Sequence, residues 1–411
     1  MKLEKRVIKY GGATFDQNEI DAVNKVMSHP DGLVPGVNVE QFESRVSQYM
    51  GKKHGVLVNS GSSALMMAMR LANIPPGSEV ITPAMTFSSD VACIYHIDCT
   101  PVFLDCGLDN YQILVDKIED VVTDKTKAIL IPDLIGGICD WDKVREIADR
   151  HNLFVIHDSA DTLGGKLRGR HTATRADISI TSFSIFHIIT ALGNGGMVFF
   201  DDDKYLDHAV TLRAWGRSSE KWKWGTKKED NDGRFLEDLD GLEYDSLYIF
   251  EDLAYGFIPN EAGAAFGIAQ MDKIQTLWDA REKRFNGHTA YLKQYEDKFI
   301  LPTIIDDTET TWLTYPVQIR PETGWSRRKF QVHLEESGIY SRVIFSGNIT
   351  RHPMLKNRPY RVHPEGLPNS DQIMKYGIML PCHPTMNDDD CAYLYQVIEE
   401  FVAADGNPTR G

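Results

Sequence analysis

Short apolar runs alternate with helical patterns over much of the first two hundred residues. The runs VLVNS, EVITP and KAILIPD are too apolar to face water on either side, and each is followed by a stretch with the periodicity of a helix. Strands that are buried on both faces and joined through helices are typical of a mostly parallel sheet. The pattern therefore predicts an α/β fold with a doubly wound, mostly parallel sheet.

Changes in this pattern divide the chain into three parts. Residues 1–50 hold two helical stretches separated by the turn-rich HPDGLVPG, and we expect an N-terminal arm there. Residues 51–275 carry the sheet pattern and are predicted to form the large domain. Within it, the highly charged residues 217–252 are expected to be mostly a solvated loop, although two tryptophans suggest that part of it packs. Residues 276–411 are predicted to form a connecting helix and a smaller C-terminal α+β domain.

Charge and composition exclude several classes of protein. The chain has 411 residues, of which 44 are Lys or Arg and 59 are Asp or Glu, so its net charge is −15. Such a surface does not attract a polyanion, and we expect no nucleic-acid partner. The sequence shows no run of about 18 apolar residues and no apolar signal-peptide core, so we expect a cytoplasmic protein with no membrane partner. Six scattered cysteines without CxxC spacing predict reduced thiols, and the histidine spacing predicts no metal site.

The segment VNSGSSAL, residues 58–65, is a candidate phosphate site. A strand ends here in small residues and leads into a helix, whose first turn exposes backbone N–H groups near the positive end of the helix dipole. The alternative is that the serines only cap the helix, a role in which serine is preferred. The residues leave both interpretations open.

Two acidic residues follow another predicted strand in IHDSAD. Asp158 closes the strand, at the carboxyl edge where open α/β sheets bind their ligands. A carboxylate at that place is able to hold a proton on a buried heterocyclic nitrogen, and Asp161 is close enough in sequence to reach the same ligand. The alternative for an aspartate at a strand end is a role in a turn or a cap.

A third candidate is the segment TSFSIFH with the glycine-rich loop after it. Ser182 and His187 lie at the end of a predicted strand, where a hydroxyl can bind phosphate and an imidazole can transfer a proton. A single histidine between two apolar residues is more often structural, so the segment alone does not establish catalysis.

Taken in order, five motifs resemble those of the DegT/DnrJ/EryC1/StrS sugar aminotransferases, a family of fold type I enzymes that use pyridoxal phosphate. The motifs are SGSSAL, PAMTF, HDSAD, TSFSIFH with its following glycines, and AYGFIPNEAGAAFGIAQM. The resemblance covers most of the chain and implies the fold type I architecture. It also implies a homodimer with shared active sites.

The resemblance assigns roles to individual side chains. Gly61, Ser62 and Ser182 resemble ligands of the cofactor phosphate. Phe87 resembles the ring that stacks on the pyridine, and Asp158 resembles the partner of the pyridine nitrogen. The residues expected in the cofactor site are Gly61, Ser62, Phe87, Asp158, Asp161 and Ser182.

One departure from the family is informative. The aminotransferases have a lysine, five residues beyond the serine of the SF turn, that anchors the cofactor covalently. This chain has His187 at that position, and no lysine lies between Lys166 and Lys204. An imidazole cannot form the covalent bond, so we expect the cofactor to be held by non-covalent contacts alone.

The branch of the family that shares this histidine consists of 3-dehydratases of nucleotide-linked 4-keto-6-deoxy sugars. Residues 346–355 and 373–386 also resemble this branch, and we expect Asn348 and Arg351 to bind substrate. The resemblance implies PLP/PMP as cofactor, glutamate as amino donor and a nucleotide-linked keto sugar as substrate, with the nucleotide left open. Because residues 212–255 contain no cysteine, we expect the kind that has no iron–sulfur cluster.

In the mechanism that the resemblance implies, His187 removes a proton from the methylene carbon of pyridoxamine phosphate and returns it to the departing C3 hydroxyl. The alternative outcomes are another PMP-dependent conversion and transamination of a keto sugar. A non-catalytic homologue is disfavoured because Asp158 and the phosphate serines are retained. Two further departures are Gly256, where the family has an asparagine donated across the dimer to the phosphate, and Asn194, where an acid is usual.

Overall fold

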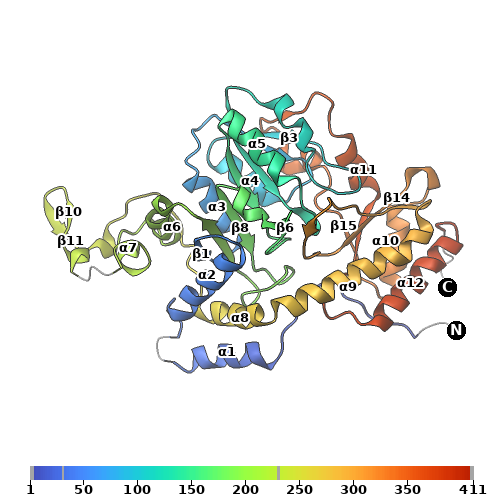
Figure 1. The fold of residues 1–411 in the computed structure, drawn as a ribbon, viewed down its shortest axis with the longest axis horizontal. Coiled ribbons are helices and arrows are strands. Elements are labelled where there is room, and N and C mark those ends of the chain that lie inside the picture. The colour runs from blue at the N-terminus through green and yellow to red at the C-terminus, as the bar shows by residue number, and fades with distance from the viewer. Residues whose placement is uncertain (1–3, 30–31, 229–231, 408–411) are drawn as a thin grey trace.

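An eight-stranded sheet forms the centre of the molecule in the computed structural model, which describes residues 4–29, 32–228 and 232–407 (Figure 1). Its strands, in chain order, are β1 (His54–Val58), β2 (Glu79–Pro83), β3 (Thr100–Leu104), β4 (Thr126–Pro132), β5 (Phe154–Asp158), β8 (Ile178–Ser182), β9 (Gly196–Phe200) and β16 (Arg361–Val362). Their order across the sheet is β1-β9-β8-β5-β4-β2-β3-β16. All neighbours from β8 to β16 are parallel, whereas β9 runs antiparallel to both β8 and β1. The predicted mostly parallel sheet is confirmed.

Helices cover both faces of this sheet, because its strands are apolar on both sides. Within β5, Ile156 packs into the core formed with α3 (Gly61–Leu71), α4 (Ser88–His96) and α6 (Leu206–Arg213). Its neighbour Val155 points to the opposite face, where it packs with α5 (Trp141–His151). This alternation is what a doubly wound sheet requires.

A second sheet, in which all neighbouring strands are antiparallel, lies in the C-terminal third of the chain. Its order is β12-β14-β17-β15, formed by β12 (Phe299–Ile300), β14 (Tyr315–Ile319), β17 (Gly377–Leu380) and β15 (Arg342–Val343). The helices of this region are α10 (Arg327–Glu336), α11 (Pro368–Tyr376) and α12 (Asp388–Ala403). Buried aromatic and aliphatic side chains give it a separate core, to which Tyr315 and Phe401 belong. Strand β16 also comes from this part of the chain, yet it extends the large sheet, and the domain boundaries drawn from the sequence stay predictions.

Two pairs of helices link these regions. The arm consists of α1 (Gln17–Met27) and α2 (Val37–Tyr49), which pack on α8 (Glu261–Asp272). The long helix α9 (Ile274–Leu292) follows α8 and runs beneath the large sheet toward the small one (Figure 1). A small three-stranded sheet joins β6 (Lys166–Leu167), β7 (Arg170–His171) and β13 (Thr308–Glu309). Residues 30 and 31 of the predicted turn HPDGLVPG lie outside the described residues.

The charged stretch predicted as a loop projects at the left of Figure 1, away from the large sheet. It contains α7 (Glu220–Lys223) and a hairpin of β10 (Glu237–Leu239) and β11 (Leu242–Tyr244). Trp224 packs against the core beside α6, in agreement with the expectation that part of the stretch packs. Residues 229–231 of this stretch lie outside the described residues.

Two other expectations from the sequence concern the cysteines and membrane-spanning helices. All six cysteines are free thiols, as predicted, and the structure buries each of them. Among the described residues, no helix combines the length and the apolar character needed to cross a membrane.

Candidate active site

A cavity of about 610 Å³ opens where the carboxyl ends of the parallel strands meet the chain around the second sheet. Strands β4, β5 and β8 all end at this edge, and α3 and α4 begin there. From the other side, β15 contributes Arg342 and Val343, and the chain beyond it contributes Phe345. The site is therefore built by the two sheets together, at the edge where ligands bind in open α/β folds.

One end of the cavity has the form of an anion site. Helix α3 begins at Gly61, and Ser60 caps it by accepting a hydrogen bond from the N–H of Ser63 at 3.1 Å. Because Ser60 does the capping, Ser62 and Ser182 can direct their hydroxyls to a ligand. The end of β8 lies so close that a Cβ on Gly61 would be 2.6 Å from Cβ of Ser182. Only glycine leaves room for the start of α3 to lie this close to the end of β8. Both segments can therefore contact one small anion.

Phe87 stands opposite, at the N-terminus of α4. It lines the cavity, and the residue is 53% exposed. The ring of Phe345 lies 6.1 Å away in an edge-to-face arrangement. An exposed aromatic face of this kind is available to stack on a flat heterocycle.

The floor of the cavity is acidic. Asp158, the last residue of β5, is buried and accepts a hydrogen bond from the N–H of Ala160 at 2.8 Å. Burial, and next to it the neighbouring carboxyl of Asp90, raises the pKa of Asp158 well above its ordinary value. No Lys or Arg of the described residues forms an ion pair with Asp90, Asp158 or Asp161. The cavity is therefore suited to a ligand that brings a positive charge to this floor.

Asp161 is held by an unusual turn. Its Oδ2 accepts a hydrogen bond of 2.8 Å from the N–H of Ile135, a residue that adopts the left-handed conformation at a φ of 66°. Burial is the main cause that raises the pKa of Asp161 to about 7, although the Ile135 hydrogen bond acts in the opposite direction. At neutral pH this carboxyl is thus close to half protonated, and it can either donate or accept a hydrogen bond.

His187 faces Asp161 across the cavity. It lies in the closed turn between β8 and β9, where Thr190 donates a hydrogen bond to the carbonyl of Phe183 at 2.8 Å. Nε2 of His187 is 3.7 Å from Oδ1 of Asp161, and the side chain is 21% exposed. Burial, followed by the positive charge of Arg281, lowers the pKa of His187 to about 4. The imidazole is therefore neutral at physiological pH and can accept a proton.

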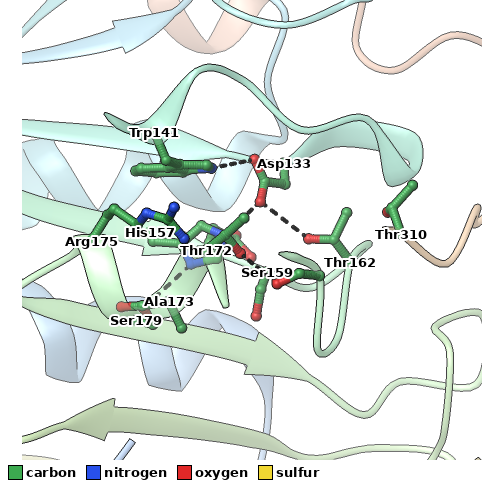
Figure 2. Close-up of polar contacts among 12 residues, drawn as sticks. Asp133, Trp141, His157, Ser159, Thr162, Thr172, Ala173, Arg175, Ser179 and Thr310 are labelled. Atoms are coloured by element: carbon green, nitrogen blue, oxygen red, sulfur yellow. Dashed lines mark hydrogen bonds and ion pairs between the residues drawn. The ribbon is translucent and has the colours of Figure 1, made fainter. Parts of the chain in front are cut away.

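A buried polar network supports this floor from below (Figure 2). Asp133 accepts hydrogen bonds from Nε1 of Trp141 at 2.9 Å and from the hydroxyl of Thr162 at 3.4 Å, and its Oδ2 lies 2.8 Å from Nε2 of His157. The N–H of Asp133 also donates to the carbonyl of Asp158 at 2.9 Å. The network joins the ends of β4 and β5 and so fixes the strand end that carries Asp158.

The structure brings most of the residues selected from the sequence into this one cavity. Those that line it are Gly61, Ser62, Phe87, Asp158, Asp161, Ser182 and His187. Asn348 and Arg351 do not line it: both bind Asp371 of α11, Arg351 through two guanidinium nitrogens and Asn348 through its amide at 2.7 Å. Their role in substrate binding stays a prediction.

Several lining residues were not selected from the sequence. Arg342 lies over the ring of Tyr10, 5.4 Å from its centre, and places a cation at the cavity mouth. Asp90 lies on the floor beside Asp158 and comes four residues after Thr86 of the PAMTF motif. An aspartate in the first turn of a helix resembles an ordinary stabilising charge, so no local pattern places it in a site.

The glycine found in place of the family's asparagine has a local explanation. A Cβ on Gly256 would lie 2.8 Å from Nε1 of Trp215. The indole therefore occupies the space beside this backbone position, and a larger residue would displace it.

The model of the DegT/DnrJ/EryC1/StrS aminotransferase family matches residues 13–399. The chain belongs to this family. The names of two of its relatives describe different enzymes. The chain is 31% identical over 408 residues to dTDP-4-dehydro-2,6-dideoxy-D-glucose 3-dehydratase of Saccharopolyspora spinosa, covering 96% of this chain and 87% of the relative. It is 27% identical over 396 residues to GDP-perosamine synthase of Caulobacter vibrioides, covering 96% and 98%.

A solved structure supports the fold. The structure of GDP-4-keto-6-deoxy-D-mannose-3-dehydratase from E. coli, with bound hydrated PLP, is similar to this chain at a TM-score of 0.85 and 23% identity, covering 95% of this chain and 100% of that one. The predicted fold type I architecture is confirmed. Among the described residues, no group of three or more His, Cys, Asp or Glu side chains is arranged to hold a metal ion.

Proposed function

We propose that the protein is a PLP/PMP-dependent 3-dehydratase of a nucleotide-linked 4-keto-6-deoxy sugar, with glutamate as amino donor. The observation that carries the proposal is the position of His187 in the cavity, at the place where the family's lysine is expected. No lysine lines the cavity in the described part of the chain. A neutral imidazole at this place can move a proton but cannot bind the cofactor covalently.

The cavity fits the cofactor at three points. Gly61, Ser62 and Ser182 would hold the phosphate at the N-terminus of α3, where backbone N–H groups and the helix dipole favour an anion. Phe87 would stack on the ring. Asp158 would pair with the protonated ring nitrogen, which would supply the positive charge that the acidic floor lacks. When bound, pyridoxamine phosphate supplies a primary amine that reacts with a ketone and a ring that withdraws electrons.

His187 and Asp161 move the proton. Because the pKa of His187 is lowered to about 4, Nε2 is free to accept a proton at neutral pH and gives it up readily to the departing C3 hydroxyl oxygen of the sugar. Asp161, at 3.7 Å, orients the ring and stabilises the imidazolium while it is protonated. One group thus serves first as base and then as acid.

The surroundings of the cavity support the remaining parts of the proposal. Arg342 and Tyr10 at the mouth suit the diphosphate of a nucleotide sugar. The absence of cysteine between residues 212 and 255 favours the kind without an iron–sulfur cluster. Exposed apolar side chains on the projecting stretch, among them Leu239, Leu242 and Phe250, favour a homodimer.

Transamination is a second candidate, because the family includes a GDP-perosamine synthase at 27% identity. Dehydration and transamination differ in their stoichiometry. In dehydration, each turnover removes one C3 oxygen from the sugar, oxidises one glutamate to 2-oxoglutarate and releases one ammonia. In transamination, the glutamate nitrogen stays on the sugar and no ammonia appears.

The experiment incubates the enzyme with PLP, glutamate and a panel of GDP-, dTDP- and CDP-linked 4-keto-6-deoxy sugars. We expect equal amounts of 2-oxoglutarate and ammonia, together with a 3-deoxy sugar by mass spectrometry. Formation of an amino sugar without ammonia would establish transamination instead. Lack of any 2-oxoglutarate with every sugar would contradict both candidates.

A further inference from the structure

A second aspartate stands directly behind the one assigned to the ring nitrogen. Asp90, in the first turn of α4, is completely buried and lines the floor of the cavity. Both Asp90 and Asp158 line this floor, and each carboxyl affects the pKa of the other. The proposed function gives Asp158 a role and leaves Asp90 without one.

The hydrogen bonds of Asp90 leave one of its oxygens open. Oδ2 accepts a hydrogen bond from the hydroxyl of Thr86 at 2.6 Å, whereas Oδ1 is buried and receives none from any donor group of the described residues. A buried carboxylate oxygen without a donor is costly, but the same oxygen bearing a proton becomes a donor itself. The carboxyl of Asp158, which interacts with that of Asp90, is able to accept that proton.

The groups around Asp90 and Asp158 also favour a proton on the pair. The other titratable groups that face it are Cys93 of α4, whose thiol is kept neutral by burial, and Asp161. Neither brings a positive charge. Burial is the main cause that raises the pKa of both Asp90 and Asp158, and for Asp158 the neighbouring Asp90 raises it further. Two adjacent negative charges in a buried site repel each other, which favours one proton shared by the pair.

We infer that Asp90 and Asp158 hold one proton between them, so that the pair carries a single negative charge, and that with cofactor bound Asp90 keeps the proton and donates it to Asp158. Asp90 is then a positioning residue. It aims the ionised Asp158 at the ring nitrogen and leaves one negative charge, not two, to balance one pyridinium. This inference rests on the proposed role of Asp158.

The decisive measurement is infrared difference spectroscopy of the full-length enzyme with bound PLP at a pH above 8, where Asp161 is ionised. We expect the carbonyl band of one buried carboxylic acid. Asp90→Asn should remove this band, and Asp161→Asn should leave it. A band that persists in Asp90→Asn, or no band in the unaltered enzyme, would overturn the inference.

A second readout follows the ring nitrogen itself, through the ¹⁵N chemical shift of labelled PLP. In Asp90→Asn the amide still donates to Asp158, so we expect the nitrogen to remain protonated and the Kd for PLP to change less than tenfold. Asp90→Leu lacks this donor, and we expect its Kd to rise about ten- to a hundredfold, as for loss of a hydrogen bond to a charged group. Equal effects of the two substitutions would contradict the inference.

The controls separate this inference from the proposed function. Asp105→Asn alters another buried aspartate that lies outside the cavity, and it should change neither the band nor the nitrogen shift. If the nitrogen is unprotonated in the unaltered enzyme, or stays protonated in Asp158→Asn, the role of Asp158 in the proposed function fails. If protonation of the ring nitrogen depends on Asp158, but the infrared carbonyl band persists in Asp90→Asn, only the present inference fails.

Discussion

Nε2 of His187 lies 3.7 Å from Oδ1 of Asp161. Burial shifts the pKa values of these two side chains in opposite directions. The pKa of the imidazole falls to about 4, whereas that of the carboxyl rises to about 7. Both groups are therefore driven toward their neutral forms at physiological pH. A neutral base beside a neutral or weakly acidic carboxyl can take up a proton without first losing a fixed ion pair.

The first prediction concerns the role of His187 as a base. His187→Asn keeps a polar side chain of similar size but cannot accept the proton. We expect kcat for sugar dehydration to fall by about 10² to 10⁴, the usual contribution of general base catalysis. The Kd for PLP should change little, because the histidine holds none of the cofactor groups. A variant that loses cofactor affinity in proportion to its activity would assign His187 to binding instead.

The second prediction concerns the pH dependence of stability in the cofactor-free protein. Because the folded-state pKa of Asp161 is raised to about 7, its contribution to stability is fully present below its ordinary pKa and is lost as the pH rises through 7. Asp161→Asn removes this titration. We expect the free energy of unfolding of the unaltered protein to fall between pH 4 and 7, by as much as about 4 kcal/mol from this group, and to fall less in the variant. Urea unfolding at a series of pH values measures both, and parallel curves would contradict the assignment.

Agreement between sequence and structure is closest where a motif coincides with a strand end. Gly61, Asp158 and Ser182 each lie at the junction of a buried strand and the segment after it, and parallel strands bring such junctions to one edge. The periodicity that predicts the sheet therefore also predicts the meeting of these residues.

Side chains whose role depends on a distant partner were harder to predict. Arg351 has the charge expected for a diphosphate ligand, but Asp371 in α11 binds its guanidinium. Asp90 enters the site because α4 begins at the cavity at which β5 ends, which no local pattern reveals. The three-dimensional packing of separate segments decides both cases, and periodicity within one segment contains no information about it.

A third prediction tests the close approach at the phosphate end. In Gly61→Ala the new methyl group would lie 2.6 Å from Cβ of Ser182 and force the two segments apart. We expect a loss of about 1 to 3 kcal/mol in stability, as for other overpacked sites, and a weaker Kd for PLP in a fluorescence titration. The control is Gly287→Ala in α9, where the nearest atom is 3.4 Å away and no loss of affinity is expected. Unchanged PLP affinity in Gly61→Ala would show that this junction does not bind the phosphate.

A fourth prediction tests the network beneath the floor. Trp141→Phe removes the indole donor from Oδ1 of Asp133 at a fully buried place, and we expect it to lower the free energy of unfolding by about 1 to 3 kcal/mol. Trp325→Phe is a matched control, because its indole donates to Asp405 at the surface, where water can replace it. Thermal or urea unfolding compares the two. Equal losses would mean that burial of the acceptor does not matter.

The most direct test of the central claim is borohydride reduction of the PLP-loaded enzyme followed by intact-protein mass spectrometry, with His187→Lys beside the unaltered protein. The account predicts that the unaltered protein keeps its own mass, because no lysine reaches the cofactor. His187→Lys should gain the mass of one reduced cofactor and lose sugar dehydration. Covalent cofactor on the unaltered protein, or dehydration retained in His187→Lys, would contradict the claim that a histidine in the place of the lysine determines the reaction.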